Sequence, residues 1–347
     1  MGILILKVCA LLDWRRTTIQ AIPNPSHREI GTKPTLRSLT TLTIGAAPKR
    51  NGSENLMPAP HLSPENAGSA PVIALHCSGA GGSQWRQLGE TLGPNYQLFA
   101  PEHYGCERGA SWSGMHAFTL ADEAVRTIDL IDRTDRKVHL VGHSYGGGVA
   151  LHVALARPGR IASLSLYEPS AFHLLKAMGE RNNPAFAEIA DITRVTGQGV
   201  IAGDYAGAAA AFVDYWGRQG AWAALRPTVQ AALMRWVPKA PLDFRALIEE
   251  PTSLAAYGRL HMPVLVMRGE HAPLPTLKIA KMLSSVLPQA RLAVISGAGH
   301  MGPLTHGSAV SELIATHIDT AEAAIRQLPD RSRVGSNNLL SLAWAVA

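Results

Sequence analysis

Ser144 is the residue best placed to do chemistry, because it lies at the centre of the run GHSYGG. An apolar strand pattern at 138–141 precedes this run, and the helix-forming run VALHVALA at 149–156 follows it. The pattern G-x-S-x-G between a strand and a helix is typical of a nucleophile elbow, a sharp turn that exposes the serine hydroxyl. Gly142 and Gly146 stand where a side chain would collide with neighbouring backbone. We therefore predict an exposed, activatable hydroxyl on Ser144.

His300 is the candidate base for that hydroxyl. It ends the run ISGAGH, in which a strand pattern gives way to a glycine-rich loop. A histidine in this setting can accept the serine proton and return it to a leaving group. His306 lies where the last helix is expected to begin, so we assign it a surface or capping role.

These residues need a scaffold, and the chain predicts an α/β fold. Six short apolar runs are predicted as buried parallel strands: 71–79, 96–102, 137–144, 161–169, 263–270 and 290–297. Helical patterns separate most of them, at 83–92, 118–133, 276–287 and 308–328. Strands that alternate with helices predict a mostly parallel sheet with helices on both faces.

The segment 171–260 interrupts this alternation and contains no convincing strand pattern. It is rich in alanine, its prolines cluster towards the end, and five aromatic residues are interleaved: Phe212, Tyr215, Trp216, Trp222 and Trp236. We predict an inserted helical cap. Aromatic residues at helical spacing are more often core than pocket, so we favour a core role over lining an apolar substrate pocket.

The formal net charge of +6 does not indicate a polyanionic partner. Residues 1–50 contain eight Lys or Arg residues against Asp13 and Glu29, so this segment carries the whole excess of positive charge. The remainder is neutral, and we expect no nucleic-acid partner. A hydrophobic content of 46% is sufficient for a large core, and we expect one domain with an insertion.

Residues 1–66 are expected to be a basic N-terminal extension that is poorly ordered or comes from an over-extended reading frame. Its first apolar stretch is interrupted by Lys7 and lacks an A-x-A-like cleavage site, so it is a poor secretory signal. Its Arg-, Ser- and Thr-rich, acid-poor composition also resembles a transit peptide. No apolar run approaches the roughly 20 residues that span a bilayer. We expect a soluble, cytoplasmic protein, and the sequence carries no signal for an oligomeric state.

The cysteines favour a reducing compartment. Cys9, Cys77 and Cys106 form no C-x-x-C pair, which argues against a disulfide framework or a zinc site. His76 stands beside Cys77, but adjacent residues on a strand point to opposite faces. We expect Cys77 to be a small core residue, and we expect neither a metal ion nor a cofactor.

Four features follow one another in a characteristic order: HCSGAGGSQW after a strand, GHSYGG after a later strand, a carboxylate after a still later one, and SGAGHMGP near the end. In this order, residues 70–328 resemble the α/β-hydrolase fold superfamily, and in particular its capped, serine-nucleophile, esterase-like members. The resemblance implies a hydrolase core at 67–170 and 261–328, the cap at 171–260 and a C-terminal tail at 329–347. It also implies Ser144 as nucleophile and His300 as general base.

The same resemblance implies an oxyanion hole. In the family, two backbone N–H groups stabilise the oxyanion, one from the residue after the nucleophile and one from the loop after the early strand. These correspond to Tyr145 and Ser78. Cys77 stands where glycine is usual in that loop, so Cys77 remains an alternative donor.

The third member of the triad departs from the family pattern. Relatives usually place an Asp after the penultimate strand, but Ala272 occupies the corresponding position in RGEHAP. A carboxylate is needed to hold the imidazole in the right tautomer, and some relatives carry it after the earlier strand that ends here at Glu168. The YEP context, in which Pro169 ends the strand at the sheet edge, favours Glu168. Glu270 is the alternative acid, and Glu168 could instead anchor the cap through a salt bridge.

The resemblance implies hydrolysis of a small, partly apolar carboxylic ester. A serine in the elbow disfavours epoxide hydrolase and haloalkane dehalogenase chemistry, for which related proteins use an aspartate. Cofactor-free C–C bond hydrolysis, thioester hydrolysis and perhydrolysis by the same triad stay open, because the fold hosts many functions. A hypothesis of another class is a non-catalytic receptor for an apolar ligand, with a vestigial triad.

Overall fold

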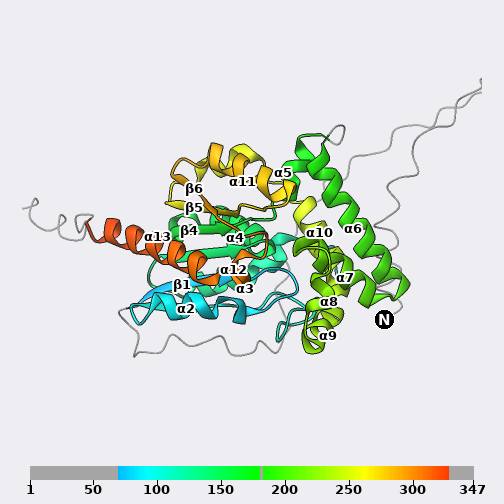
Figure 1. Cartoon of the computed structure of the whole chain (residues 1–347). Helices are drawn as coiled ribbons and strands as arrows, with labels where there is room; N and C mark the ends of the chain where they lie inside the picture. The colour runs from blue at the N-terminus through cyan, green and yellow to red at the C-terminus, as the bar shows by residue number, and fades with distance from the viewer. Residues whose placement is uncertain (1–68, 180–182, 328–347) are drawn as a thin grey trace, which may run out of the picture.

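A computed structural model describes residues 69–179 and 183–327 of the chain. The expected N-terminal extension (1–66) and C-terminal tail (329–347) lie outside these residues. Six strands form one parallel sheet in the order β2-β1-β3-β4-β5-β6 (Figure 1). They are β1 (Ala70–Leu75), β2 (Tyr96–Phe99), β3 (Val138–His143), β4 (Ile161–Tyr167), β5 (Val264–Gly269) and β6 (Ala290–Ile295).

The register of the sheet gathers the residues singled out in the sequence. In the central strand β3, Leu140 pairs with Ile73 of β1 on one side and with Leu164 of β4 on the other. Parallel strands end at a common edge, and ligand sites of open α/β sheets collect there. The segments that follow β1, β3 and β4 therefore lie at one edge of the sheet.

Successive side chains of the central strands enter two different cores. Ile73 and Leu140 belong to one apolar cluster, whereas Val72 and Val141 belong to the other. This alternation follows from the two-residue period of a strand. Because both faces are apolar, both must be covered.

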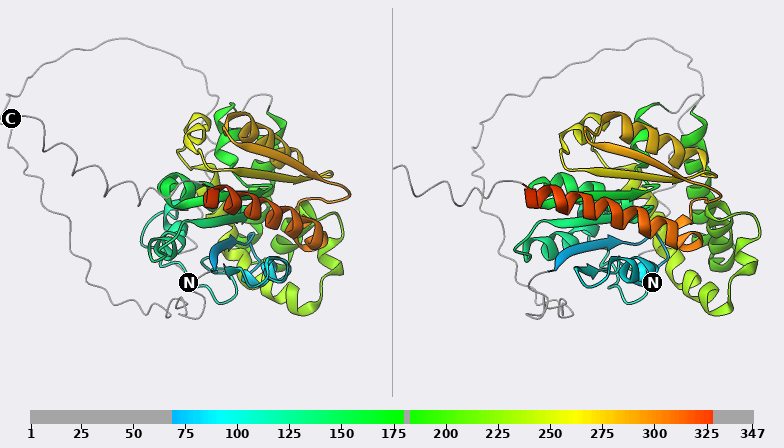
Figure 2. Two further views of the ribbon diagram at one scale, coloured as in Figure 1. Left: turned by 90° about the vertical axis from the view of Figure 1, so that its left-hand side faces the viewer. Right: turned by 60° about the vertical axis from the view of Figure 1, so that its left-hand side comes forward.

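Helices cover both faces, which confirms the predicted fold class. Leu88 of α2 and Ile314 of α13 join the cluster on one face, and helices α3, α4 and α11 contribute to the cluster on the other. The right-hand view of Figure 2 shows α13, in red-orange, running along the sheet. The helical elements outside the segment between β4 and β5, which we call the α/β core together with the sheet, are η2 (Gly82–Trp85), α2 (Arg86–Leu92), α3 (Leu120–Asp132), α4 (Tyr145–Ala156), η3 (Pro158–Arg160), α11 (Leu274–Val286), α12 (Gly302–Thr305) and α13 (Gly307–Gln327).

The prediction of a buried strand is wrong for β6. Its side chains are partly exposed, with Leu292 at 39% and Val294 at 49%. The reason is that β6 is the last strand of the sheet, paired with β5 alone among the described strands. An apolar run in the sequence does not distinguish an edge strand from a central one.

Between β4 and β5, every regular element that the structure describes is a helix, and none is a strand. Helices α6 to α10 lie together at one end of the sheet, in green to yellow-green (Figure 1). These elements are α5 (Phe172–Ala177), α6 (Pro184–Ala202), α7 (Tyr205–Trp216), α8 (Ala221–Ala224), α9 (Pro227–Trp236), η4 (Val237–Lys239), α10 (Ala240–Ile248) and η5 (Leu254–Arg259). We call α5 to α10 the cap helices. In the described ranges, no helix combines the length and apolar character needed to cross a membrane.

Candidate active site

A strained turn holds Ser144 between β3 and α4. Its φ of 54° and ψ of −117° are unusual for a residue with a side chain. A Cβ atom at Gly142 would lie 2.5 Å from the carbonyl oxygen of Gly146, and one at Gly146 would lie 2.4 Å from that of Leu75. Both positions therefore require glycine, and the backbone has the geometry of a nucleophile elbow.

His300 connects Ser144 to Glu168. Its Nε2 lies 2.8 Å from Ser144 Oγ, and its Nδ1 lies 2.8 Å from Glu168 Oε2. A carboxylate only accepts hydrogen bonds, so Nδ1 carries the proton and the lone pair of Nε2 faces the serine hydroxyl. All three side chains are buried. The structure thus brings together the serine, the histidine and the first of the two candidate acids.

Glu168 is fixed on both carboxylate oxygens. Oε1 accepts the backbone N–H of Gly269 at 2.9 Å, and Oε2 accepts the hydroxyl of Thr276 at 2.7 Å as well as His300. Burial acts to raise the pKa of Glu168, but the hydrogen bonds from His300, Gly269 and Thr276 outweigh it and leave the pKa below its ordinary value. Glu168 is therefore an anion at neutral pH, as an acid that orients an imidazole must be.

Glu270 has a different position and different partners. It is exposed, and its Oε2 accepts the hydroxyl of Ser296 at 2.9 Å and the backbone N–H of Gly297 at 2.8 Å. These bonds tie the residue after β5 to the residues after β6. The alternative acid thus braces a loop, while the Nδ1 atom of His300 is bonded to Glu168.

Of the three candidate oxyanion donors, Cys77 and Ser78 lie in the loop after β1, and Tyr145 begins α4. The backbone N–H of Cys77 donates to Gln84 Oε1 at 3.2 Å, so that donor is already engaged. Tyr145 is the first residue of α4, and an N–H at that position has no acceptor within its own helix. The Cys77 side chain is buried, as expected of a core residue, and burial raises the pKa of its thiol to about 12.

Two further groups at the site escaped the sequence analysis. Ser170 Oγ lies 3.2 Å from Ser144 Oγ, and when Ser144 donates its proton to His300, Ser170 must be the donor in this contact. His143 donates from Nε2 to the carbonyl oxygen of His300 at 2.9 Å and so holds the loop that carries His300. His143 lies inside the elbow run, but nothing in the pattern indicated which backbone group it would bind.

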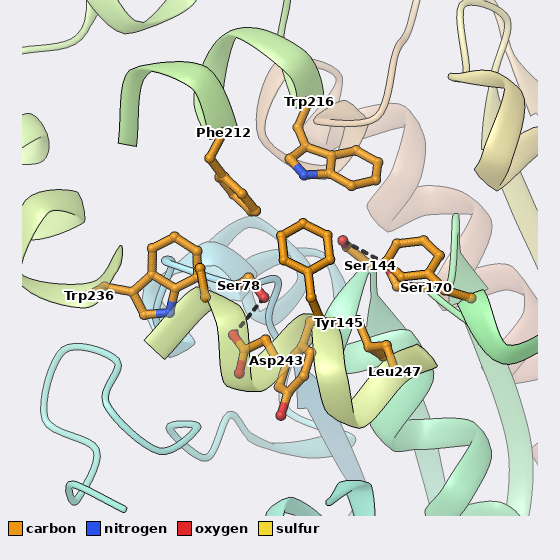
Figure 3. A pocket seen from close by; sticks show the side chains of 12 residues that line it. Ser78, Ser144, Tyr145, Ser170, Phe212, Trp216, Trp236, Asp243 and Leu247 are labelled. Carbon is orange, nitrogen blue, oxygen red and sulfur yellow. Dashed lines mark hydrogen bonds between the residues drawn. The ribbon is translucent and has the colours of Figure 1, made fainter. Parts of the chain in front are cut away.

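A small, partly open cavity adjoins Ser144 and is lined largely by side chains of the cap helices (Figure 3). Its volume of about 20 Å³ holds about one water molecule. Apolar and aromatic side chains provide most of its wall: Phe172, Phe212, Trp216, Trp236, Ala240, Phe244 and Leu247. Trp216 of α7 also packs on His300, with ring centroids 4.3 Å apart. Helix α7 therefore covers His300 itself.

The predicted core role of the interleaved aromatic residues is confirmed for Trp216 and Trp236, but the preference for core over pocket is incomplete, because Phe212, Trp216 and Trp236 also line the cavity. Trp216 and Trp236 are buried in apolar clusters and also line the cavity. The two roles coincide because the apolar face of the cap helices is the surface that closes over Ser144. Tyr215 and Trp222 are only partly buried and are not among the lining residues.

The other histidines singled out in the sequence have local partners. His76 contacts the carbonyl oxygen of Cys77 through Nδ1, and its Nε2 lies 3.4 Å from Glu102. His306 lies between α12 and α13 and contacts the hydroxyl of Thr305. In the part of the chain that the structure describes, no group of three or more His, Cys, Asp or Glu residues could hold a metal ion.

Comparison with known proteins identifies the family. Residues 72–313 match the model of the alpha/beta hydrolase family. The chain belongs to this family, which confirms the resemblance found in the sequence.

Individual relatives are distant. Identity is 28% with the polyketide synthase ThaQ of Burkholderia thailandensis, over 72% of this chain but only 12% of that protein. It is 26% with a 2-hydroxymuconate semialdehyde hydrolase of Pseudomonas sp. strain CF600, over 73% of this chain and 88% of the relative. A thermophilic esterase from Thermogutta terrifontis superposes with a TM-score of 0.57 at 21% identity, over 73% of this chain and 90% of that structure. The chain thus spans about an eighth of the polyketide synthase, and the likeness to the esterase concerns the fold alone.

Proposed function

We propose that this protein is a serine hydrolase that cleaves a small, partly apolar carboxylic ester through an acyl-enzyme on Ser144. The observation that carries the proposal is the buried chain of contacts from Ser144 Oγ through both nitrogens of His300 to Glu168, at 2.8 Å each. A bystander serine in a glycine-rich turn would not need a histidine whose other nitrogen is held by a buried carboxylate.

The geometry supports the following sequence of steps. His300 Nε2 takes the proton of Ser144 as Oγ attacks the ester carbonyl carbon, and Glu168 stabilises the resulting imidazolium. The tetrahedral intermediate collapses, and His300 gives its proton to the departing alcohol. Water then attacks the acyl-enzyme with His300 again as base, which releases the carboxylic acid and restores Ser144.

The oxyanion that forms in both steps requires fixed donors. We assign this role to the backbone N–H groups of Ser78 and Tyr145. The engagement of the Cys77 N–H by Gln84 supports Ser78 over Cys77. The position of Tyr145 at the start of α4 adds the favourable end of a helix dipole to its N–H.

The walls of the cavity support an uncharged, partly apolar acyl group. Most are aromatic or aliphatic, and the charged side chain among the described lining residues is Asp243. An acyl chain with its own carboxylate would meet a carboxylate in a desolvated site, without a lining Lys or Arg to pair with it. The small volume further favours short acyl groups.

Hydrolysis of a C–C bond is the second candidate. It is favoured by the 26% sequence identity to the 2-hydroxymuconate semialdehyde hydrolase, which extends over 73% of this chain and 88% of that protein. A muconate is a carboxylate, however, so the same charge argument at Asp243 ranks this candidate below an uncharged ester.

A panel of p-nitrophenyl esters from acetate to octanoate tests the proposal, with Ser144→Ala as the matched variant. The proposal predicts turnover by the native chain, highest for the short esters, and no turnover by Ser144→Ala. Tight binding of an apolar ligand together with no turnover of any ester would instead identify a receptor with a vestigial triad.

A further inference from the structure

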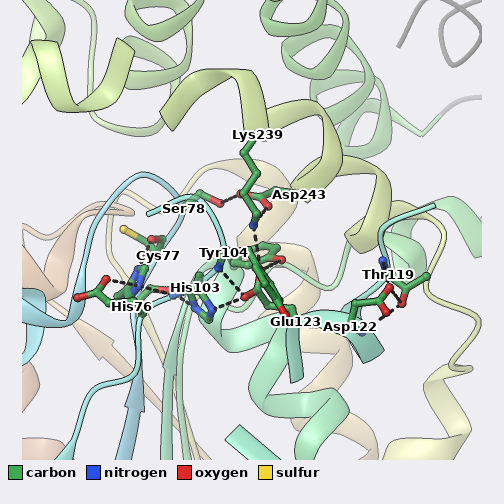
Figure 4. Close-up of polar contacts among 12 residues, drawn as sticks. His76, Cys77, Ser78, His103, Tyr104, Thr119, Asp122, Glu123, Lys239 and Asp243 are labelled. Atoms are coloured by element: carbon green, nitrogen blue, oxygen red, sulfur yellow. Dashed lines mark hydrogen bonds and ion pairs between the residues drawn. The ribbon is translucent and has the colours of Figure 1, made fainter. Parts of the chain in front are cut away.

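A buried charged cluster lies beside the catalytic residues and has no part in the proton transfers described above. Lys239 Nζ lies 2.9 Å from Glu123 Oε2 and 2.5 Å from Asp243 Oδ1 (Figure 4). The three side chains are nearly inaccessible, with exposures of 8%, 2% and 4%. Charges buried to this extent are costly unless they are paired, so their positions are tightly constrained.

The cluster joins the cap helices to the α/β core. Lys239 ends η4 and Asp243 lies on α10, whereas Glu123 lies on α3. Glu123 is fixed further on the core side, because its Oε1 accepts the backbone N–H of Tyr104 at 2.9 Å and lies 3.3 Å from His103 Nδ1. One end of the cluster is therefore rigid and the other belongs to the insertion.

Both proposed oxyanion residues bind this cluster through their side chains. The hydroxyl of Ser78 donates to Asp243 Oδ2 at 3.0 Å, a contact drawn in Figures 3 and 4. The hydroxyl of Tyr145 donates to Glu123 Oε2 at 2.8 Å, the same oxygen that Lys239 contacts. The loop after β1 and the first residue of α4 are thus linked to each other through three buried charges.

An oxyanion hole works only when its donors point at the place where the oxyanion forms and lie about 2.7–3.1 Å from it. The loop that carries Ser78 has no regular secondary structure before η2. Its position must be set by contacts of its own. The bond from Ser78 to Asp243 supplies such a contact, and it comes from a cap helix.

We propose that Lys239 and Asp243 are positioning residues for the oxyanion hole, so that the seating of the cap helices sets the distance between the N–H groups of Ser78 and Tyr145. This inference rests on the proposed function, because it assigns a role within the same site. It makes the cap part of the catalytic apparatus as well as the wall of the substrate pocket.

The test is the double variant Lys239→Met/Asp243→Leu. It replaces a buried ion pair by apolar side chains of similar size. It also removes the Lys239 partner of Glu123, which keeps its contacts with Tyr104, Tyr145 and His103. We expect a folded variant with a lowered melting temperature, because a buried charge that loses one of its partners is destabilising. We expect kcat to fall about tenfold, part of the larger loss that follows removal of a donor, with KM within about threefold.

The inhibition constant of a boronic acid distinguishes a positioning role from a merely structural one, because a merely structural role would leave this constant unchanged. The tetrahedral adduct of the boronic acid with Ser144 mimics the transition state, so the inhibition constant should rise about as much as kcat falls. The matched control is Arg245→Met/Glu249→Leu, which removes a more exposed ion pair of 2.7 Å at the end of the same helix α10. This control should keep the native kcat and the native boronate affinity.

A folded Lys239→Met/Asp243→Leu variant with native kcat and native boronate affinity would overturn the inference. If the double variant does not fold, Ser78→Ala decides, because it breaks the same contact without moving a buried charge. The inference then predicts about a tenfold loss of kcat, and an unchanged kcat contradicts it. Failure of the proposed function is a separate result, since the native chain would then hydrolyse no ester at all.

Discussion

At the scale of residues, the structure bears on the two candidate acids, of which the sequence favoured Glu168 over Glu270: His300 Nδ1 contacts Glu168. Glu168 and Glu270 each follow a strand, and each lies near the carboxyl edge of the sheet. Position in the sheet separates them, because β4 is the neighbour of β3 whereas β5 is one strand further away. The φ of 40° at Glu168 is a strained conformation that persists only where surrounding structure imposes it.

Glu168→Gln should lower kcat by about 10⁴, because an amide can favour the wrong tautomer of His300 and cannot stabilise its imidazolium. Glu270→Gln should keep kcat within about threefold of the native value, since Glu270 only braces a loop. Steady-state kinetics on one short ester measures both. High activity in Glu168→Gln would refute the assignment of the acid.

Asp243 should give the protein a pH-dependent stability below neutrality. Burial and the neighbouring Glu123 raise the pKa of Asp243 to about 6, although Lys239 opposes the shift. A carboxyl with a raised pKa binds its proton more readily in the folded state, so its contribution to stability is lost as pH rises from about 4 to about 6. Asn does not titrate, and the stability of Asp243→Asn relative to the native protein should therefore increase over this range.

Urea unfolding of both proteins at several pH values measures that difference. Other groups titrate alike in the two proteins where their surroundings are unchanged. Their contributions therefore cancel in the difference between the two free energies of unfolding at each pH. A difference that is constant from pH 4 to pH 6 would show that Asp243 titrates normally.

At the scale of elements, strand and helix positions were largely predictable, but contacts between distant segments were not. Apolar runs located all six strands, and the glycine pattern around Ser144 located the turn between β3 and α4. Neither the apolar runs nor the glycine pattern indicated the role of Thr276, which binds Glu168 although the two residues are 108 positions apart. The same holds for Lys239 and Glu123, which are 116 positions apart. Such contacts depend on how elements distant in the sequence pack together, and residue periodicity does not encode that packing.

Helix α7 should limit the length of the acyl chain. Trp216→Ala removes the ring that packs on His300 and lines the cavity, so it should open space beside Ser144. We expect kcat/KM for the octanoate ester, relative to acetate, to rise about tenfold or more, since each added methylene in an apolar pocket contributes about 1 kcal/mol or more. Trp222→Ala, on α8 and away from the cavity lining, is the control and should leave the chain-length profile unchanged. An unchanged profile in Trp216→Ala would contradict the role of α7.

At the scale of the whole molecule, the insertion and the α/β core share one apolar core. A single cluster contains Phe172, Ile189 and Phe244 from the cap helices together with Leu140 and Leu164 from the sheet. The predicted division of the chain at 171–260 therefore separates two segments of sequence that are packed together in the structure. Their shared burial couples the position of the cap helices to strands β3 and β4, which lead directly into Ser144 and Glu168.

Thermal unfolding of the described region should consequently be one cooperative transition. Differential scanning calorimetry of the native chain should give one peak, with equal calorimetric and van't Hoff enthalpies, because neither part can lose the shared core alone. Two separated peaks, the first without loss of the sheet, would mean that the cap unfolds independently.

The central claim is that Ser144 is a nucleophile activated by His300, and covalent labelling tests it most directly. Treatment with a fluorophosphonate, followed by mass spectrometry of the proteolysed chain, should find one adduct, on the peptide that contains Ser144. The adduct should be absent from Ser144→Ala. An unlabelled native protein, or an adduct that persists on another serine in Ser144→Ala, would contradict the account.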